Sequence, residues 1–313
     1  MRRTALALAL LTLALGLAAG CGPDPAADHK AIALVMKTRN NPFFIEMERA
    51  ARAAADKRGV RLLVAAADDD ADVERQVEIL ETYLVRRVGA IAVTPCGSKA
   101  VVPFVRRANH AGIPILAVDT RIDGETLVAF GAHVETFIGS DNFEGGRLAG
   151  DFLGKLMGGK GEVAVIEGLA GHETGDNRKN GFLRGIGTFK GITVVASQTG
   201  EWDQEKAYNA TQSILLAHPK VGGIFACNDR MAMGALRFVD KEGSPYRATV
   251  KIVGFDAADD ARAAIKKHGP FVASVAQFPS EMGRLAVERA LMVVDRMGTL
   301  PPVIPTKVEL VKD

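Results

Sequence analysis

The sequence predicts an α/β protein built from two doubly wound parallel sheets. Apolar, strand-like runs alternate with amphipathic helical patterns along the chain after residue 30. The runs are continuous in Val, Ile and Ala, which is typical of parallel strands buried on both faces. A chain of 313 residues is long for one hydrophobic core and sufficient for two.

The order of the elements follows from hydrophobic patterns and capping residues. The runs expected to form strands are Ile32–Met36, Arg61–Ala66, Ala90–Thr94, Ile113–Val118, Thr136–Gly139, Glu162–Glu167, Thr193–Gln198, Gly223–Ala226, Val250–Phe255 and Val272–Ala276. The patterns expected to form helices are Phe44–Arg58, Ala71–Val85, Lys99–Ala111, Glu144–Met157, Asp176–Phe189, Gln204–Ala217, Asp229–Lys241, Asp259–Lys267 and Ser280–Met297. Many of these helices begin after Asp, Asn, Ser or Pro and end near Gly, the usual capping asymmetry.

Two connections in the middle of the chain decide the domain organisation. The chain is expected to cross from one sheet to the other around Gly139 to Asn142. The stretch from Arg121 to Thr136 is long for a connection between a helix and a strand. We interpret it as an extra hairpin at the domain edge.

The first residues have the layout of a secretory signal, so they are excluded from the fold. Two arginines form a positive start, residues 5–19 are almost continuously apolar, and three small residues precede Cys21. This resembles the lipobox of bacterial lipoproteins, in which the cysteine is lipidated and becomes the mature N-terminus. The alternative is an ordinary signal peptide with Cys21 as an incidental thiol. We predict a signal peptide at 1–20 and a flexible tether at 21–29.

The composition excludes several classes of protein. Charged residues make up 24% of the chain and the net charge is +2, so no basic field indicates nucleic-acid binding. No run after the signal is long and apolar enough to cross a bilayer. Beyond Cys21, only Cys96 and Cys227 remain. They either pair or stay as small buried hydrophobes, and we favour the unpaired form.

Polar and aromatic side chains follow the first predicted strand. Lys37, Asn41, Phe43 and Phe44 lie where the strand ends and a helical pattern begins. In an open parallel sheet, ligands bind beyond the carboxyl ends of the strands. A phenylalanine pair is ordinarily core, but Pro42 suits a first helical turn and leaves the Asn41 side chain free. Aromatic faces beside amides and a lysine suit the C–H faces and hydroxyl rim of a sugar or polyol.

The same arrangement recurs at later strand ends. Asp119, Asn228, Asp256 and Gln277 each end an apolar run. Any one of them is explained equally well as a cap of the next turn or helix. We assign that role to Asp229, which leaves Asn228 as the ligand candidate. A series of polar strand ends in both halves of the chain favours a shared binding site.

Trp202 and Arg178 complete the first set of candidates. Trp202 is the only tryptophan and lies in a loop after a strand. It is either a lid on the core or a platform that stacks on a sugar face. Arg178 lies near a helix start and is either solvated or holds two ligand oxygens with its planar guanidinium group.

The sequence lacks the motifs of catalysis and metal binding. Asp68, Asp70 and Asp72 have the alternate spacing of a calcium loop, but Val73 and Ile79 stand where Gly and Glu are required. We interpret these acids as a loop and helix-start cluster. No zinc-ligand pair, Walker loop or nucleophile elbow is present. We therefore expect no metal, no cofactor and no enzyme activity.

Together, these residues resemble the bacterial periplasmic sugar-binding proteins of the ribose-binding type. The resemblance covers residues 30–313 and is carried by Asn40–Phe44, Ser140–Asn142, Phe225–Ala235, Val253–Asp256 and Ala276–Gln277. It implies a type I periplasmic binding protein fold, in which two lobes are joined by a multi-strand hinge. The implied lobes are 30–139 plus 278–305 and 140–277 plus 306–313, with a last strand, Thr306–Val311, in the second lobe.

The resemblance also implies a ligand site between the lobes. The implied contacts are Asn41, Phe43, Phe44, Asp119, Arg178, Trp202, Asn228, Asp256 and Gln277. The aromatic members sandwich the carbon skeleton of the ligand. The carboxylates accept hydrogen bonds from hydroxyls, the arginine donates, and the amides do both.

Three positions depart from the ribose-type pattern, and we add them to the candidate site. Lys37 stands in place of a small hydroxyl residue, Thr94 in place of an asparagine and Thr120 in place of an arginine. Lys37 also resembles a lysine in proteins that bind the signal autoinducer-2. It either faces the pocket, points to solvent, or pairs with Asp119 or Asp141. We predict a pentose-like sugar or a short polyol as the ligand, not ribopyranose itself.

The resemblance implies the solute-binding component of an ABC importer for carbohydrates. Hinge closure on the ligand would present a closed shape to the permease in the membrane. We expect a monomer in the periplasm or at the cell surface, held to the membrane only through its N-terminal lipid. The alternatives are a quorum-signal (autoinducer-2-type) or chemosensory receptor, a repressor-type regulator and an enzyme that uses the cleft. The export signal stands where a repressor needs its helix-turn-helix.

Overall fold

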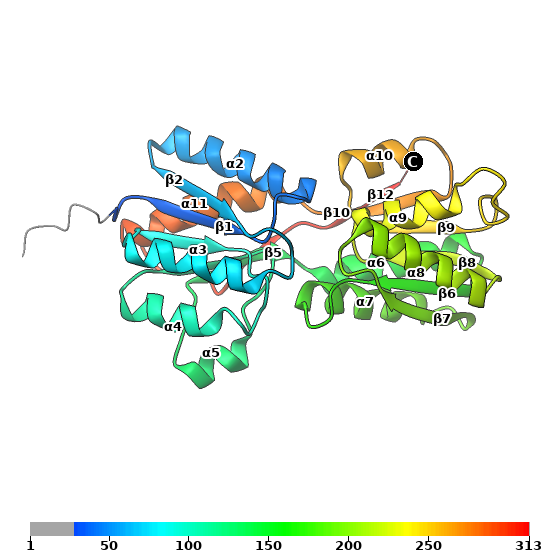
Figure 1. Ribbon diagram of the computed structural model, residues 1–313, viewed down its shortest axis with the longest axis horizontal. Coiled ribbons are helices and arrows are strands. Elements are labelled where there is room, and N and C mark those ends of the chain that lie inside the picture. Colours follow the sequence, from blue (N-terminus) through cyan, green and yellow to red (C-terminus); the bar gives the residue numbers. More distant parts are fainter. Residues whose placement is uncertain (1–27, 313) are drawn as a thin grey trace, which may run out of the picture.

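The computed structural model describes residues 28–312, which form two lobes side by side (Figure 1). Each lobe contains a six-stranded sheet with helices on both faces. The predicted α/β class with two doubly wound sheets is therefore confirmed. The predicted signal peptide at 1–20, the lipidation site Cys21 and most of the predicted tether lie outside the described residues.

In the first lobe, all neighbouring strands are parallel, in the order β11-β5-β4-β3-β1-β2. Its elements are β1 (Ile32–Met36), α2 (Pro42–Arg58), β2 (Leu62–Ala66), α3 (Val73–Val85), β3 (Ala90–Val93), α4 (Val102–His110), β4 (Ile115–Val118), α5 (Gly124–Phe130), β5 (Thr136–Ser140), α11 (Pro279–Val294) and β11 (Val303–Thr306). Strand β1 pairs with both β2 and β3, so the strand order reverses there. Ligands bind at such switch points in doubly wound sheets.

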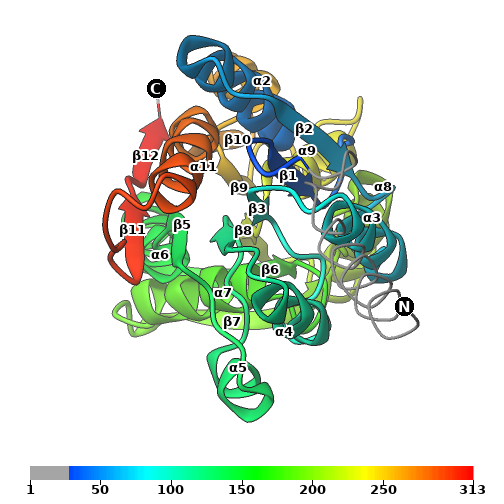
Figure 2. The same ribbon diagram turned by 90° about the vertical axis from the view of Figure 1, so that its left-hand side faces the viewer.

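Alternating side chains of β1 fill two separate cores. Ile32 and Leu34 pack under α2 and α11, whereas Ala33 and Val35 pack under α3 and α4. Figure 2 shows these two helix pairs on opposite sides of the sheet. Because both faces are buried, the strand is apolar throughout, and its first polar residues come only where it leaves the sheet.

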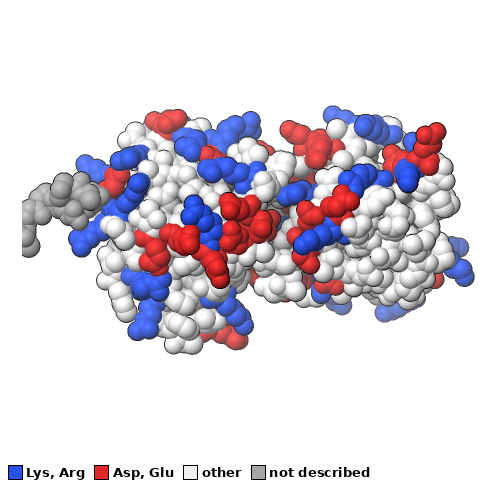
Figure 3. All heavy atoms as spheres, viewed as in Figure 1, with Lys and Arg blue, Asp and Glu red and all other residues white. Residues whose placement is uncertain are grey.

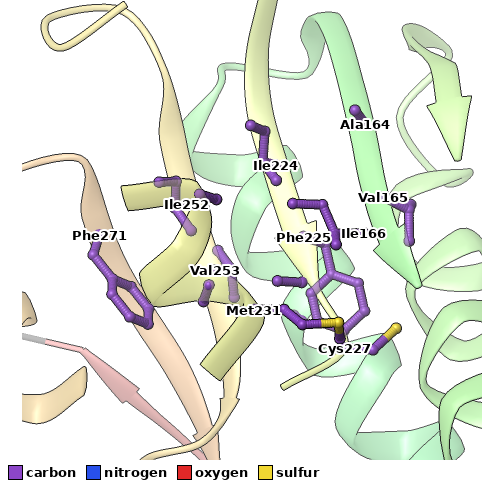
Figure 4. Close-up of a cluster of buried hydrophobic side chains, with 14 of the residues drawn as sticks. Ala164, Val165, Ile166, Ile224, Phe225, Cys227, Met231, Ile252, Val253 and Phe271 are labelled. Carbon is purple, nitrogen blue, oxygen red and sulfur yellow. The ribbon is translucent and has the colours of Figure 1, made fainter. Parts of the chain in front are cut away.

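The second lobe repeats this plan, in the order β12-β10-β9-β8-β6-β7, with only β12 antiparallel. Its elements are α6 (Asn142–Leu156), β6 (Lys160–Glu167), α7 (Glu173–Ile186), β7 (Gly191–Thr199), α8 (Gln204–Ala217), β8 (Val221–Ala226), α9 (Asp229–Val239), β9 (Lys251–Asp256), α10 (Asp259–Ile265), β10 (Phe271–Ala276) and β12 (Glu309–Lys312). Figure 4 shows side chains of β6, β8 and β9 interleaved in its core. The Phe225 ring stacks on the Phe182 ring of α7 at 4.6 Å.

The chain passes between the lobes after β5, after β10 and after β11 (Figure 1). The last passage corrects the prediction of one strand over Thr306–Val311. Thr306 ends β11 beside Ser140, and Glu309 begins β12 beside Ala276 in the other sheet. One continuous strand cannot pair with both sheets, so it is broken between these residues.

The predicted hairpin between Arg121 and Thr136 is also wrong, because the stretch contains helix α5. Asp123 caps this helix by accepting a hydrogen bond from the Thr126 amide at 2.9 Å. Gly131 ends it in the left-handed conformation, with φ of 61°. Leu127 alone among the helix residues is buried, so the segment carries almost no helical periodicity.

Candidate functional site

A crevice between the lobes gathers most of the predicted site residues. The crevice is narrow in this position of the lobes, with a cavity volume of about 30 Å³, well below the roughly 300–1,000 Å³ of small-molecule sites. Its walls are formed by Lys37, Asn41, Phe43, Phe44, Asp70, Asp119, Thr174, Arg178, Trp202, Asn228, Asp256 and Gln277. Every predicted site residue except Thr94 and Thr120 lines it. Strand ends of both sheets therefore face one space.

The aromatic wall comes from the first turn of α2. Pro42 starts this helix, so Phe43 and Phe44 follow directly on the first strand and are both buried. Their rings meet edge to face, with centroids 5.2 Å apart. The Asn41 Oδ1 accepts a hydrogen bond from the Phe43 amide at 3.0 Å. The prediction that the Asn41 side chain is free is therefore wrong for its oxygen atom. An N-cap side chain is drawn to the unpaired amides of the helix.

Lys37 lines the crevice and pairs with Asp119. It is 3% exposed, and its Nζ donates to the Thr120 Oγ1 at 2.8 Å and lies 3.7 Å from an Asp119 oxygen. The Thr120 hydroxyl in turn donates to the Asp119 carboxylate at 2.9 Å. The Thr94 Oγ1 accepts from the Lys37 backbone amide at 3.0 Å. Thr94 and Thr120 thus hold Lys37 and are not among the residues that line the crevice.

Arg178 lines the crevice and is held in place by residues of the second lobe. Its Nε donates to the Asn142 side chain at 2.8 Å and its Nη1 donates to the Cys227 carbonyl at 2.9 Å. Its guanidinium group lies 3.9 Å from the centre of the Phe255 ring. Helix α7, which carries it, packs closely on α6, since a Cβ at Gly146 would lie 2.1 Å from the Arg178 carbonyl oxygen.

Asp256 and Gln277 form the polar wall beside Arg178. An Arg178 nitrogen lies 3.5 Å from the Asp256 carboxylate, and the Gln277 Nε2 donates to the same oxygen at 2.7 Å. Burial raises the pKa of Asp256 to about 6 against the opposing effect of Arg178. The Gln277 Oε1 is buried and has no hydrogen-bond partner within residues 28–312. This oxygen is an open acceptor on the wall.

Trp202 forms the opposite aromatic wall and is held in one orientation. Its Nε1 donates to the His172 Nδ1 at 3.1 Å, and its ring covers Gly168, where a Cβ would lie 2.1 Å from it. Burial, with a contribution from the Lys37 charge, lowers the pKa of His172 to about 4. The imidazole is therefore neutral at pH 7 and able to accept this hydrogen bond.

Asn228 lines the crevice, but the predicted division of roles with its neighbour is wrong. Asn228 caps α9, because its Oδ1 accepts from the Met231 amide at 2.9 Å. Asp229 instead turns into the lobe, where it accepts hydrogen bonds from Ser274 and the Ala258 amide. Burial, reinforced by Asp256, raises the pKa of Asp229.

The structure adds two residues that the sequence did not single out for the site. Asp70 follows β2 and Thr174 lies in the first turn of α7. Asp70 also follows a predicted strand, but its acidic neighbours led to its interpretation as part of a loop and helix-start cluster. Nothing in the sequence distinguished Thr174 from other residues of a helix start.

Residues 28–312 show no sign of a metal site, a reactive thiol or a membrane-spanning helix. No group of three or more potential metal ligands occurs in residues 28–312. Cys96 and Cys227 are buried and unpaired there, which confirms the favoured alternative. Burial raises the pKa of each thiol to about 12, so neither is a reactive thiolate at pH 7. In the same part of the chain, no helix combines the length and the apolar character that a bilayer crossing needs.

Comparison with known proteins agrees with this architecture. Residues 32–298 match the periplasmic binding protein domain family. The ribose import binding protein RbsB of Salmonella typhimurium is 36% identical over 283 residues, 90% of each chain. The D-allose-binding periplasmic protein of Escherichia coli K12 is 33% identical over 272 residues, 86% of each chain.

Among solved structures, a periplasmic solute-binding protein of an ABC transporter from Actinobacillus succinogenes 130z, with bound D-allose, superposes with a TM-score of 0.85. It is 35% identical, and the match covers 90% of this chain and 97% of that one. The extent of these matches, together with two doubly wound lobes around one crevice, places the chain in the periplasmic binding protein family.

Proposed function

We propose that this protein is the periplasmic solute-binding component of an ABC importer and that it carries a neutral, pentose-like sugar or a short polyol. The observation that carries the proposal is the open acceptor of Gln277 in a crevice lined by both lobes. A buried carbonyl oxygen without a partner is costly, so it calls for a donor from a ligand. Sugar hydroxyls supply such donors.

The remaining walls suit the same ligand. Phe43, Phe44 and Trp202 offer aromatic surface for the C–H faces of a sugar ring. Asp119 and Asp256 are acceptors for hydroxyls, and the ionised groups make these hydrogen bonds stronger than neutral ones. The relatives are binding proteins of sugar importers. We infer a transport role without turnover.

Transport by this protein would proceed by closure of the lobes about the connections between them. We retain 30–139 plus 278–305 and 140–277 plus 306–313 as the two moving bodies. A contact across the crevice supports closure onto the ligand, since the Glu173 carboxylate lies 3.7 Å from the Arg121 side chain of the other lobe. A ligand that bridges both lobes shifts the population towards the closed form, which a permease then recognises.

We further propose that the protein acts as a monomer and that lipidation of Cys21 holds it to the membrane. The apolar segment 5–19 and the small residues before Cys21 support this anchoring. Growth with a radiolabelled fatty acid, followed by isolation of the protein, tests it. Label that persists after Cys21→Ser would contradict lipidation at this residue.

Titration calorimetry with D-ribose, D-allose, D-arabinitol and D-ribonate tests the ligand class. We expect one of the three neutral compounds to bind best. Its binding should change the fluorescence of Trp202, the only tryptophan. Gln277→Met should weaken that binding tenfold or more. The matched control is Ser98→Ala, because the Ser98 Oγ is also buried without a partner but lies off the crevice. Equal effects of both variants, or no binding of any neutral member, would reject the proposal.

A further inference from the structure

The crevice contains three carboxylates and two cations, and one carboxylate is left over. Arg178 lies 3.5 Å from Asp256, and Lys37 lies 3.7 Å from Asp119. The Asp70 side chain has no hydrogen bond and no ion pair with any residue of the range 28–312. It is therefore a second open acceptor on the wall, and it comes from the first lobe.

The position of Asp70 sets it apart from the other acids of its loop. It borders both the crevice and an adjoining cavity of about 190 Å³, and Trp202 borders the same two spaces. Its neighbour Asp69 is exposed and borders the outer cavity alone. Figure 3 shows acidic side chains gathered on the first lobe beside the boundary with the second. Asp70 is thus the member of this loop that a ligand in the crevice would meet.

The surroundings of Asp70 do not compensate its charge. Burial raises the pKa of Asp70, and the nearby carboxylates of Asp119 and Asp69 act in the same direction. The charges of Lys37 and Arg230 oppose the shift without cancelling it. A carboxylate in this position is stabilised by a hydrogen-bond donor and destabilised by another anion.

We propose that Asp70 is a specificity-determining residue of the sugar site. Its carboxylate accepts a hydrogen bond from one ligand hydroxyl and disfavours ligands that carry a carboxylate. The inference rests on the proposed function and adds to it the requirement that the ligand has a hydroxyl donor facing the first lobe. A site built to bond a hydroxyl discriminates against an analogue that lacks it, because the acceptor then loses its donor in the crevice.

The test compares Asp70→Asn with Asp69→Asn, two identical changes at adjacent positions. The Asp69 Oδ1 accepts from the Ala71 amide at 2.8 Å, and an asparagine oxygen preserves this bond. Titration calorimetry uses D-ribose, 2-deoxy-D-ribose, D-allose and D-ribonate. D70N should weaken the best-binding neutral sugar at least tenfold and reduce the preference for D-ribose over D-ribonate at least threefold. D69N should remain within twofold of the wild type.

Thermal unfolding without ligand separates recognition from structure. D70N removes an uncompensated, half-buried charge, so its Tm at pH 7 should equal or exceed that of the wild type. A fall of several degrees would assign Asp70 a structural role and overturn the inference. Binding of D70N within twofold of the wild type, or an unchanged preference over D-ribonate, would also overturn it. Failure of the wild type to bind any neutral sugar would instead overturn the proposed function, and the Asp70 role with it.

Discussion

Lowering the pH from 7.5 to 5.0 should weaken sugar binding about tenfold through Asp256. Burial is the largest cause that raises the pKa of this carboxyl group to about 6, and Asp119 and Asp70 act in the same direction. Arg178 and the hydrogen bond from Gln277 oppose the shift. Binding is therefore expected to depend on pH in the range in which this group titrates.

The sign and size of the effect follow from linkage. With a pKa of about 6, roughly 97% of Asp256 is ionised at pH 7.5 and roughly 9% at pH 5.0. A ligand hydroxyl donates to the carboxylate form, so binding lowers the pKa and releases a proton at acidic pH. The affinity then scales with the ionised fraction. The change is about tenfold, or about 1.4 kcal/mol.

Calorimetric titration of the best-binding neutral sugar at pH 5.0, 6.0, 7.0 and 7.5, in two buffers of different ionisation enthalpy, measures both affinity and proton release. Asp256→Asn is the control, since it should bind more weakly and with a smaller dependence on pH in this range. Asp229, which also has a raised pKa and interacts with Asp256, is tested by Asp229→Asn. A wild-type affinity that is constant across the range, or a full pH dependence in D256N, would refute the reasoning.

Two substitutions test how the walls are positioned. Gly146→Ala would place a Cβ 2.1 Å from the Arg178 carbonyl oxygen, so the helix pair must separate at a cost of roughly 1–3 kcal/mol. Calorimetric unfolding measures this, and Gly124→Ala is the control because nothing lies within 4 Å of its Cβ. Trp202→Phe removes the donor to His172 and should raise the Kd of the best-binding neutral sugar severalfold. An unchanged Kd would remove Trp202 from the ligand contacts.

Regular elements with strong local signals were predictable from the sequence. The bounds of β1 and α8 agree with prediction, because continuous apolar runs and Asp caps are local properties. Helix α5 was missed because a seven-residue helix with one buried side chain leaves no periodic pattern. The break between β11 and β12 was missed because it depends on the separation of two sheets, which no local pattern encodes.

The site shows the same division between local and tertiary information. Polar residues at strand ends are visible in the sequence, and the doubly wound topology brings them together. The choice between Asn228 and Asp229 as helix cap was not visible, because both cap helices well and burial beside Ser274 decided it. The role of Thr94 and Thr120 was not visible in the sequence either, because they contact Lys37 from the ends of other strands. Which residues of a loop face a crevice is likewise a tertiary property.

The open acceptors of the crevice also explain why closure should depend on a ligand. With the lobes in the relative position seen here, Asp70 and the Gln277 Oε1 face the crevice without a protein donor, and Asp256 carries a raised pKa. Separation of the lobes returns these groups to water, which satisfies them. Closure without a ligand therefore carries a desolvation cost that a bound polyol removes through its hydroxyl donors. A ligand shifts a conformational equilibrium only by the difference between its affinities for the two states. Because the ligand satisfies these acceptors in the closed form, its affinity for the closed form is the higher one.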